Sequence, residues 1–138
     1  PLDEILGKLA GARARLARPV ARLNEACWLA DAGARSAIDI SDGLVADLRH
    51  VAAASNVRVE VEASAIPLFP SASLADALQG GDEYELAVTS PLPLDGEAFA
   101  RRFGIPLTEI GRVESGSPTV EVRGARVADA KGYDHFSR

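Results

Sequence analysis

The sequence predicts an α+β domain in which helices pack against a mixed β-sheet. Apolar residues recur at helical spacing in the first part of the chain, and a strand–helix–strand unit is predicted between Ser36 and Glu62. The end of the chain alternates apolar and polar residues, as antiparallel strands do. With 138 residues, of which 47% are apolar and 25% are charged, the chain is long enough for one domain with its own core.

The first half of the chain is predicted to hold three helices and two strands. An amphipathic helix covers residues 2–16, and Pro19 ends it, because the residue before a proline is disfavoured in helical conformation. A second helix runs from there to Gly33, a residue type that often follows a helix end. The remaining elements are an inner strand at 36–40, a helix at 43–54 and a half-buried strand at 57–62.

Glycine residues divide the second half into shorter elements. Gly80 and Gly81 close one helix, and Gly104 ends another. Gly124 is predicted to form the turn of a terminal hairpin. In order, the elements are a proline-stiffened loop at 66–70, a helix at 73–78, a strand at 84–89, a helix at 95–103, a strand at 107–113, and hairpin strands at 119–123 and 125–127.

The composition argues against several classes of protein. Lys and Arg number 15 against 20 Asp and Glu, a net charge of −5, and no basic stripe interleaved with aromatic residues suggests nucleic-acid binding. Cys27 is the single cysteine, so it excludes an internal disulfide, and it is predicted to be a small buried side chain. No zinc-type spacing, membrane-length apolar stretch or signal peptide is present, so we expect a cytoplasmic protein. The arginines near the start are interpreted as a solvated helix face: Arg13, Arg15, Arg18 and Arg22.

The run Asp39-Ile40-Ser41-Asp42-Gly43 is the most informative segment. It places two carboxylates and a hydroxyl between a predicted strand and the start of a helix. A helix N-terminus attracts anions, but two aspartates there would repel a phosphate unless a divalent cation lay between them. The segment therefore predicts a metal–phosphate site and phosphoryl transfer. The alternative is that Asp42 caps the helix and Asp39 faces water. The chain has no G-x-x-x-x-G-K-[ST] motif, so it is not a P-loop enzyme.

A glycine turn followed by acidic residues forms a second candidate. Gly80 and Gly81 permit close approach of the backbone to a ligand, and Asp82 and Glu83 project from the loop before Tyr84. Acidic side chains at such an edge would bind a metal or a cationic substrate. The alternative is a polar turn before a strand.

The third candidate is the aromatic-rich tail at residues 131–136. We expect Phe136 to dock on the core, and Tyr133 either to dock there or to stack on a ligand ring, more favourably a cationic one. His135 has the intrinsic pKa of an acid–base group, but no neighbouring residue supports that role.

Together, these segments resemble the thiamine-monophosphate kinase family. The motifs agree with the family in order and approximate spacing, and they cover nearly the whole chain. Residues 16–23 resemble the segment that enters the family's second domain. The matching motifs are Ser-Ala-Ile-Asp-Ile-Ser-Asp-Gly-Leu at 36–44, Asp47-Leu48, His50, Ala54-Ser55, Ile66-Pro67, Gly-Gly-Asp-Glu-Tyr-Glu-Leu at 80–86, Ile-Gly-Arg-Val at 110–113 and Lys-Gly-Tyr-Asp-His-Phe at 131–136.

The resemblance implies the C-terminal domain of a two-domain enzyme, with the α+β fold of the aminoimidazole ribonucleotide synthetase superfamily. Such an enzyme transfers the γ-phosphoryl group of ATP to thiamine monophosphate, with several Mg²⁺ ions, and forms a homodimer. The chain begins at Pro1, so we expect it to be processed or cut from something longer. The N-terminal ATP-binding domain would then be absent and the chain alone catalytically incomplete.

The resemblance also implies the roles of particular residues. Asp39 and Asp42 would be Mg²⁺ ligands, and Ser41 would bind an ATP phosphate. Asp82 would contact thiamine monophosphate, and Tyr133 would line the same pocket. No residue of the chain is assigned a covalent catalytic role, because the transfer would be direct and in line.

One departure from the family concerns the acidic pair after the glycine turn. The family usually has Gly-Gly-Glu-Asp-Tyr at this place, whereas this chain has the two acids exchanged. Asp82 is one methylene shorter than the expected glutamate, so Glu83 could take over part of its role.

Two other functions remain open from the sequence: another ATP-dependent enzyme of the same superfamily, and a non-catalytic module that binds a phosphate ligand or a partner protein. We also expect an apolar patch, including the first helix, where the partner domain would lie, and hence self-association of the isolated chain.

Overall fold

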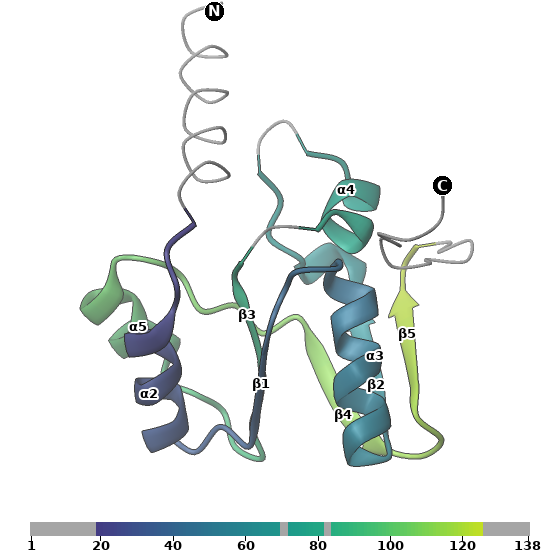
Figure 1. The fold of residues 1–138 in the computed structure, drawn as a ribbon, viewed down its shortest axis with the longest axis horizontal. Helices are drawn as coiled ribbons and strands as arrows, with labels where there is room; N and C mark the ends of the chain where they lie inside the picture. Colours follow the sequence, from purple (N-terminus) through teal and green to yellow (C-terminus); the bar gives the residue numbers. More distant parts are fainter. Residues whose placement is uncertain (1–18, 70–71, 82–83, 126–138) are drawn as a thin grey trace, which may run out of the picture.

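Figure 1 shows the chain as a computed structural model, which describes residues 19–69, 72–81 and 84–125. The predicted α+β class is confirmed, because helices pack against small β-sheets. The predicted first helix and the aromatic tail lie outside the described residues. In chain order the elements are α2 (Leu23–Asp31), β1 (Ser36–Asp39), α3 (Leu44–Ser55), β2 (Val57–Glu62), the 3₁₀ turn η1 (Ala63–Ala65), α4 (Leu74–Gln79), β3 (Leu86–Thr89), α5 (Gly96–Phe103), β4 (Gly111–Ser115) and β5 (Thr119–Arg123).

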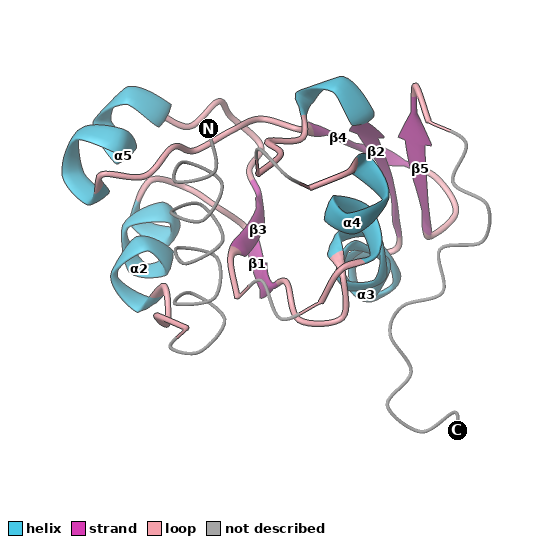
Figure 2. Ribbon diagram, turned by 90° about the horizontal axis from the view of Figure 1, so that it is seen from above, coloured by secondary structure: helices cyan, strands magenta, loops and turns pink. Residues whose placement is uncertain are grey.

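Two separate sheets are present among the described residues, where the sequence predicted one mixed sheet. β1 and β3 form an antiparallel ribbon in which Asp39 is opposite Leu86. The second sheet has the order β4-β2-β5. α3 therefore connects two sheets, and it packs against β1, β2 and β5. Figures 1 and 2 show the β1–β3 ribbon between the α2–α5 pair on one side and the larger sheet with α3 and α4 on the other.

The predicted terminal hairpin at Gly124 stays a prediction, because most of its second strand lies outside the described residues; its first strand is β5, and Gly124 after it has a φ of +80°. β5 runs parallel to β2, with Val120 and Val122 opposite the buried Val59 and Val61. β4 pairs with the other edge of β2 in the antiparallel direction, so the short link from β4 to β5 crosses the end of β2. Burial favours this arrangement, because it packs the β5 valines against the core under α3.

The main core lies between α3 and the three-stranded sheet. The helix presents apolar residues one turn apart, as its periodicity predicts, and β2 presents alternate valines. The segment after β2 and α4 close the core at one end. Its buried members are Leu44, Val45, Leu48 and Ala52 of α3, Val59 and Val61 of β2, and Ile66 and Leu78.

Most of the predicted helix ends are confirmed by their capping contacts. Ser73 and Asp76 form a capping box at the start of α4, in which each side chain accepts a bond from the other's N–H. The Asp95 side chain caps α5 by accepting from the N–H of Ala98, and α5 ends at Gly104, whose φ is +70°. Two strands begin later than the sequence predicted, since β3 starts at Leu86 and β4 at Gly111.

Burial corrects two further predictions. Cys27 is exposed, because α2 turns a different face, with the buried Leu29, toward the interior. β1 is only half-buried, and Ala37 and Asp39 are exposed, because no third strand joins its ribbon with β3 among the described residues. No helix in the described part of the chain is both long and apolar enough to cross a membrane.

The outer face of the three-stranded sheet carries an ion-pair network around a buried glutamate. Glu60 on β2 is 2% exposed and pairs with Arg58, Arg112 and Arg123, so it receives one arginine from each strand. Glu114 pairs with Arg58 and Arg112. A buried carboxylate requires such partners, because its removal from water is costly. The strict alternation of β2 thus places valines toward α3 and charges on the opposite face.

Acid is expected to weaken this network through Glu114. The hydrogen bonds from Arg58 and then Arg112 hold the pKa of the Glu114 carboxyl below its ordinary value of 4.5. A depressed folded-state pKa stabilises the fold above the unfolded pKa, and this contribution is lost as the pH falls through the folded value. A Glu114→Gln variant should therefore lose less unfolding free energy than the wild type when the pH is lowered from neutral to below 4.5. Urea unfolding at each pH measures this difference.

The control is Glu97→Gln, because Glu97 is 90% exposed and pairs only across the surface of α5 with Arg101. Its acid profile should follow that of the wild type. Identical acid profiles for the Glu114 variant and the wild type would contradict the prediction.

Candidate functional site

β1 ends in a tight turn that carries Ser41 and Asp42 to the start of α3. Gly43 is the N-cap of α3 and has a φ of +112°, a conformation that favours glycine. A Cβ atom on Gly43 would also lie 3.0 Å from the backbone of Gln79, at the end of α4. The helix therefore starts at a glycine for two steric reasons. The alternative in which Asp42 is the N-cap is wrong, because Asp42 precedes that position.

A buried carboxylate holds this turn from the helix side. Oδ2 of Asp47, in the first turn of α3, accepts hydrogen bonds from the N–H of Ser41 at 2.9 Å and from the N–H of Asp42 at 3.0 Å. Asp47 is only 2% exposed. One side chain thus orients both peptide groups. In the sequence, Asp47 stood out only as part of a motif shared with the family.

The two glycine-containing segments that the sequence singled out lie against each other. The backbone at Gly81 is so close to Ser41 that a Cβ atom on Gly81 would overlap the Ser41 carbonyl oxygen. Beyond Gly81, the N–H of Tyr84 donates to the carbonyl of Ile40 at 2.9 Å, and the N–H of Ile40 donates to the carbonyl of Glu85 at 2.8 Å. Segments about 40 residues apart in sequence therefore form one structural unit.

Three side chains around this turn could hold a metal ion. Asp42, Asp47 and His50 each offer a ligand atom, and these atoms lie within 4.8 Å of one another. The two carboxylate oxygens suit Mg²⁺ or Mn²⁺, whereas the imidazole nitrogen is a donor that softer transition metals prefer. Sequence reasoning did not assign His50 to the site. The spacing could have found it, because Asp47 and His50 are three residues apart and lie on one face of α3.

The other predicted site residues have different positions. Asp39 is exposed at the end of β1 and does not belong to the metal-compatible cluster found among the described residues. Asp82 and Tyr133 lie outside the described residues, as does Glu83. The structure thus brings Ser41 and Asp42 into one turn beside Gly81.

Glu85, the third acid of the second segment, has a structural partner. Its carboxylate receives two bonds from the guanidinium of Arg22, at 2.8 and 3.1 Å, and Arg22 also pairs with Glu25. This bidentate pair ties the residue before α2 to the segment that follows the glycine turn. Arg22, which the sequence placed on a solvated face, therefore has a specific contact.

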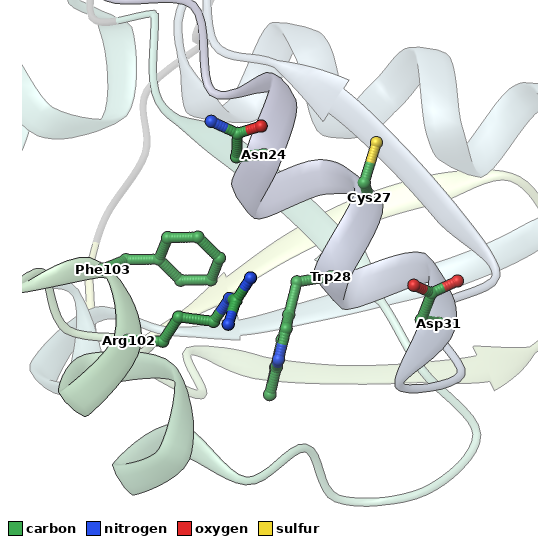
Figure 3. A pocket seen from close by; sticks show the side chains of 6 residues that line it. All are labelled: Asn24, Cys27, Trp28, Asp31, Arg102 and Phe103. Atoms are coloured by element: carbon green, nitrogen blue, oxygen red, sulfur yellow. The ribbon is translucent and has the colours of Figure 1, made fainter.

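A separate pocket of about 480 Å³ opens between α2 and α5. The guanidinium of Arg102 lies 5.5 Å from the ring centre of Phe103 in this pocket. The helices that form it lie across the β1–β3 ribbon from α3 (Figure 1), so this pocket is not part of the Asp42 turn. Figure 3 shows the side chains that line it: Asn24, Cys27, Trp28, Asp31, Arg102 and Phe103.

Comparison with known proteins identifies related sequences for most of the chain. The family model described as "AIR synthase related protein, C-terminal domain" matches residues 4–123. The thiamine-monophosphate kinase of Escherichia coli strain K12 is 33% identical over 138 aligned residues, which cover 87% of this chain and 41% of that protein. The chain thus spans about two fifths of the length of the curated relatives it matches.

Solved structures agree with these sequence matches. The crystal structure of thiamine-monophosphate kinase from Stenotrophomonas maltophilia K279a superposes with a TM-score of 0.72 at 36% identity, and the match covers 86% of this chain and 40% of that one. The structure described as AaThiL complexed with AMPPCP and TMP superposes with a TM-score of 0.69 at 34% identity, and the match covers 88% of this chain and 40% of that one. The fold that the resemblance implied is therefore confirmed.

Proposed function

Because the chain belongs to the family of AIR synthase related proteins, whose C-terminal domain it matches, we propose that it is the C-terminal domain of a thiamine-monophosphate kinase. The enzyme transfers the γ-phosphoryl group of ATP to thiamine monophosphate and forms thiamine diphosphate. The match covers only 41% of a relative of this kind. In this proposal the part of the relatives that this chain does not cover corresponds to an N-terminal domain, which supplies more of the ATP site and the homodimer contact.

The observation that carries the proposal is the meeting of the two turns. The turn with Ser41 and Asp42 carries groups suited to a metal and a phosphate, and Gly81 directly precedes the acids proposed for the acceptor. One region of the fold can therefore bind both the donor phosphates and the acceptor. A related structure is described as a complex with both AMPPCP and TMP, which supports the same pair of ligands here.

The proposed roles follow the chemistry of each side chain. Asp39 and Asp42 hold Mg²⁺, Ser41 donates its hydroxyl to a phosphate oxygen of ATP, and Asp82 and Tyr133 bind the acceptor. Ligand atoms of Asp42, Asp47 and His50 lie within 4.8 Å of one another, which supports a cation bound at Asp42 in this turn. When bound, Mg²⁺ supplies positive charge that offsets the repulsion between the two phosphate groups. Thiamine itself carries a cationic aromatic ring, which suits one carboxylate and one aromatic side chain.

Phosphoryl transfer places few covalent demands on the protein. Donor and acceptor must lie in line, and the charge on the transferred group must be stabilised. A rigid turn on a helix start meets the first demand, because Ser41 and Asp42 are fixed by hydrogen bonds before any ligand arrives. The mechanism is a direct transfer without a covalent intermediate on the enzyme.

The test is an assay of the full-length protein with ATP, Mg²⁺ and thiamine monophosphate. We expect thiamine diphosphate and ADP in equal amounts, detected by chromatography, and no turnover with the 138-residue chain alone. Thiamine and adenosine monophosphate serve as control acceptors and should not be phosphorylated. Absence of thiamine diphosphate from the full-length reaction would refute the proposed function, and turnover by the chain alone would refute its division into two domains.

A further inference from the structure

Asp47 is a buried acid that belongs to a family motif but was assigned no role from the sequence. It is 2% exposed and lies in the first turn of α3 between Leu44 and Leu48, both of which belong to the core. Glu60, the other buried acid among the described residues, is surrounded by arginines. The described partners of Asp47 are different, because they are backbone N–H groups of the candidate site.

The bonds of Asp47 run backwards from the helix to the residues before it. A helix-capping side chain normally bonds the N–H groups inside the first turn. Here Oδ2 of Asp47 accepts instead from Ser41 and Asp42, which precede the N-cap Gly43. The carboxylate thus orients the turn without capping the helix. Its charge is favourable there, because it lies near the positive end of the helix dipole.

The turn is also restrained on its carbonyl side. The carbonyl oxygen of Ser41 lies against Gly81, where no side chain could be accommodated without movement. The N–H groups of Ser41 and Asp42 meet Asp47 on the other side. The peptide plane between them therefore has little freedom to rotate, and the side chains that leave it have fixed starting directions.

From this geometry, we infer that Asp47 is a positioning residue that holds the Ser41 hydroxyl and the Asp42 carboxylate in place for the metal and the phosphate. The inference rests on the proposed function, because the groups it positions are those assigned to Mg²⁺ and ATP. A rigid arrangement matters for this chemistry, since a displacement of about 1 Å can cost about a hundredfold in rate.

A competing role for Asp47 is direct metal binding with Asp42 and His50, whose ligand atoms lie within 4.8 Å. The two roles predict different behaviour of an Asp47→Asn variant. An asparagine oxygen can still accept both N–H bonds, so the variant should keep the turn in place. The neutral asparagine would bind Mg²⁺ much more weakly than the aspartate does. If Asp47 were a direct metal ligand, Asp47→Asn would therefore weaken Mg²⁺ binding almost as much as Asp47→Ala.

The first experiment measures the turn itself, independently of catalysis. Hydrogen exchange of the full-length protein, resolved to single residues by mass spectrometry with electron-transfer fragmentation, should show slow exchange at the amides of Ser41 and Asp42 in the wild type. In Asp47→Ala both amides should exchange at least about tenfold faster, and in Asp47→Asn they should stay protected. Asp95→Ala is the matched control, because it removes a helix-start aspartate that bonds only within α5.

The second experiment measures the Mg²⁺ requirement of the transfer reaction. We expect Asp47→Ala to lower kcat by about a hundredfold, and Asp47→Asn to keep kcat and the half-saturating Mg²⁺ concentration within about tenfold of wild type. The Asp95→Ala control should keep both values. A kcat that is higher in Asp47→Asn than in Asp47→Ala indicates positioning. A general loss of stability would not produce this difference between the two variants.

Three outcomes would overturn the inference. One is fast exchange of the Ser41 and Asp42 amides in the wild type, a result that does not depend on any variant folding. Another is an Asp47→Ala protein with protected amides and full activity. The third is an Asp47→Asn protein with protected amides but a Mg²⁺ requirement raised as far as in Asp47→Ala, which would make Asp47 a ligand. Failure of the proposed function appears separately, as a wild-type protein that makes no thiamine diphosphate while its amide protection is unaffected.

Discussion

Replacing Asp42 with alanine is expected to reduce the transfer of phosphate to thiamine monophosphate by at least about a hundredfold. The reason is that, in the proposed function, Asp42 supplies a metal-binding carboxylate at the point where charge must be neutralised during the transfer. The readout is kcat at saturating ATP, measured over a series of Mg²⁺ concentrations with the full-length protein. The half-saturating Mg²⁺ concentration should rise together with the loss of rate.

The same substitution is expected to leave stability unchanged or to raise it. Asp42 and Asp47 place carboxylate oxygens within 4.8 Å of each other, so their like charges repel when no ion lies between them. Asp42 is not the N-cap of α3, so alanine removes no capping bond at Gly43. Loss of activity without loss of thermal stability would thus be the signature of a binding group retained at a cost in stability.

Asp31→Ala is the control for Asp42, because Asp31 is an exposed aspartate at the end of α2. It should change neither the rate nor the Mg²⁺ requirement. Wild-type activity in the Asp42→Ala protein would contradict the metal-binding role and leave Asp42 as a solvated residue before the helix.

Replacing Gly81 with alanine is expected to damage both stability and activity. The new Cβ atom would overlap the carbonyl oxygen of Ser41, and backbone atoms on both sides must move to relieve the contact. Overpacking of this kind typically costs about 1–3 kcal/mol of unfolding free energy. A shift of the Ser41–Asp42 turn by about 1 Å should lower kcat by about a hundredfold. Urea unfolding and the transfer assay measure the two effects on the same protein.

Gly116→Ala is the matched control for this substitution. Gly116 lies in the exposed link between β4 and β5, and a Cβ atom there would meet only the Cβ of Arg58 at 3.4 Å, an ordinary contact. Its effect on stability should stay within about 0.5 kcal/mol, with unchanged kcat. If Gly81→Ala changed stability and kcat as little as Gly116→Ala, the close approach of the two turns would be unnecessary for stability and for activity, and the prediction would be wrong.

The local elements of this protein are predictable from its sequence. The helix period in α3, the alternation in β2 and the helix-ending Gly104 each depend on neighbours within a few residues, and all three agree with the structure. The turn at Ser41–Gly43 belongs to the same class. Its chemistry is local too, because one aspartate at the end of a strand and a second just before a glycine already indicate a charged helix start.

The tertiary structure decided how these elements combine. The parallel pairing of β5 with β2 was not predicted, and it places Val120 and Val122 beside the buried Val59 and Val61. Cys27 has an apolar sequence environment and is nevertheless exposed, because packing against other elements selects which face of α2 is covered.

The candidate site divides in the same way. The sequence predicted Asp39 and Asp42 as metal ligands from their residue types and spacing, and the family resemblance implied the phosphate contact of Ser41. Only the fold placed Gly81 against Ser41 and brought Asp47 and His50 beside Asp42. The physical reason is that a backbone conformation is set mainly by nearby residues, whereas burial and close approach depend on segments far apart in the chain.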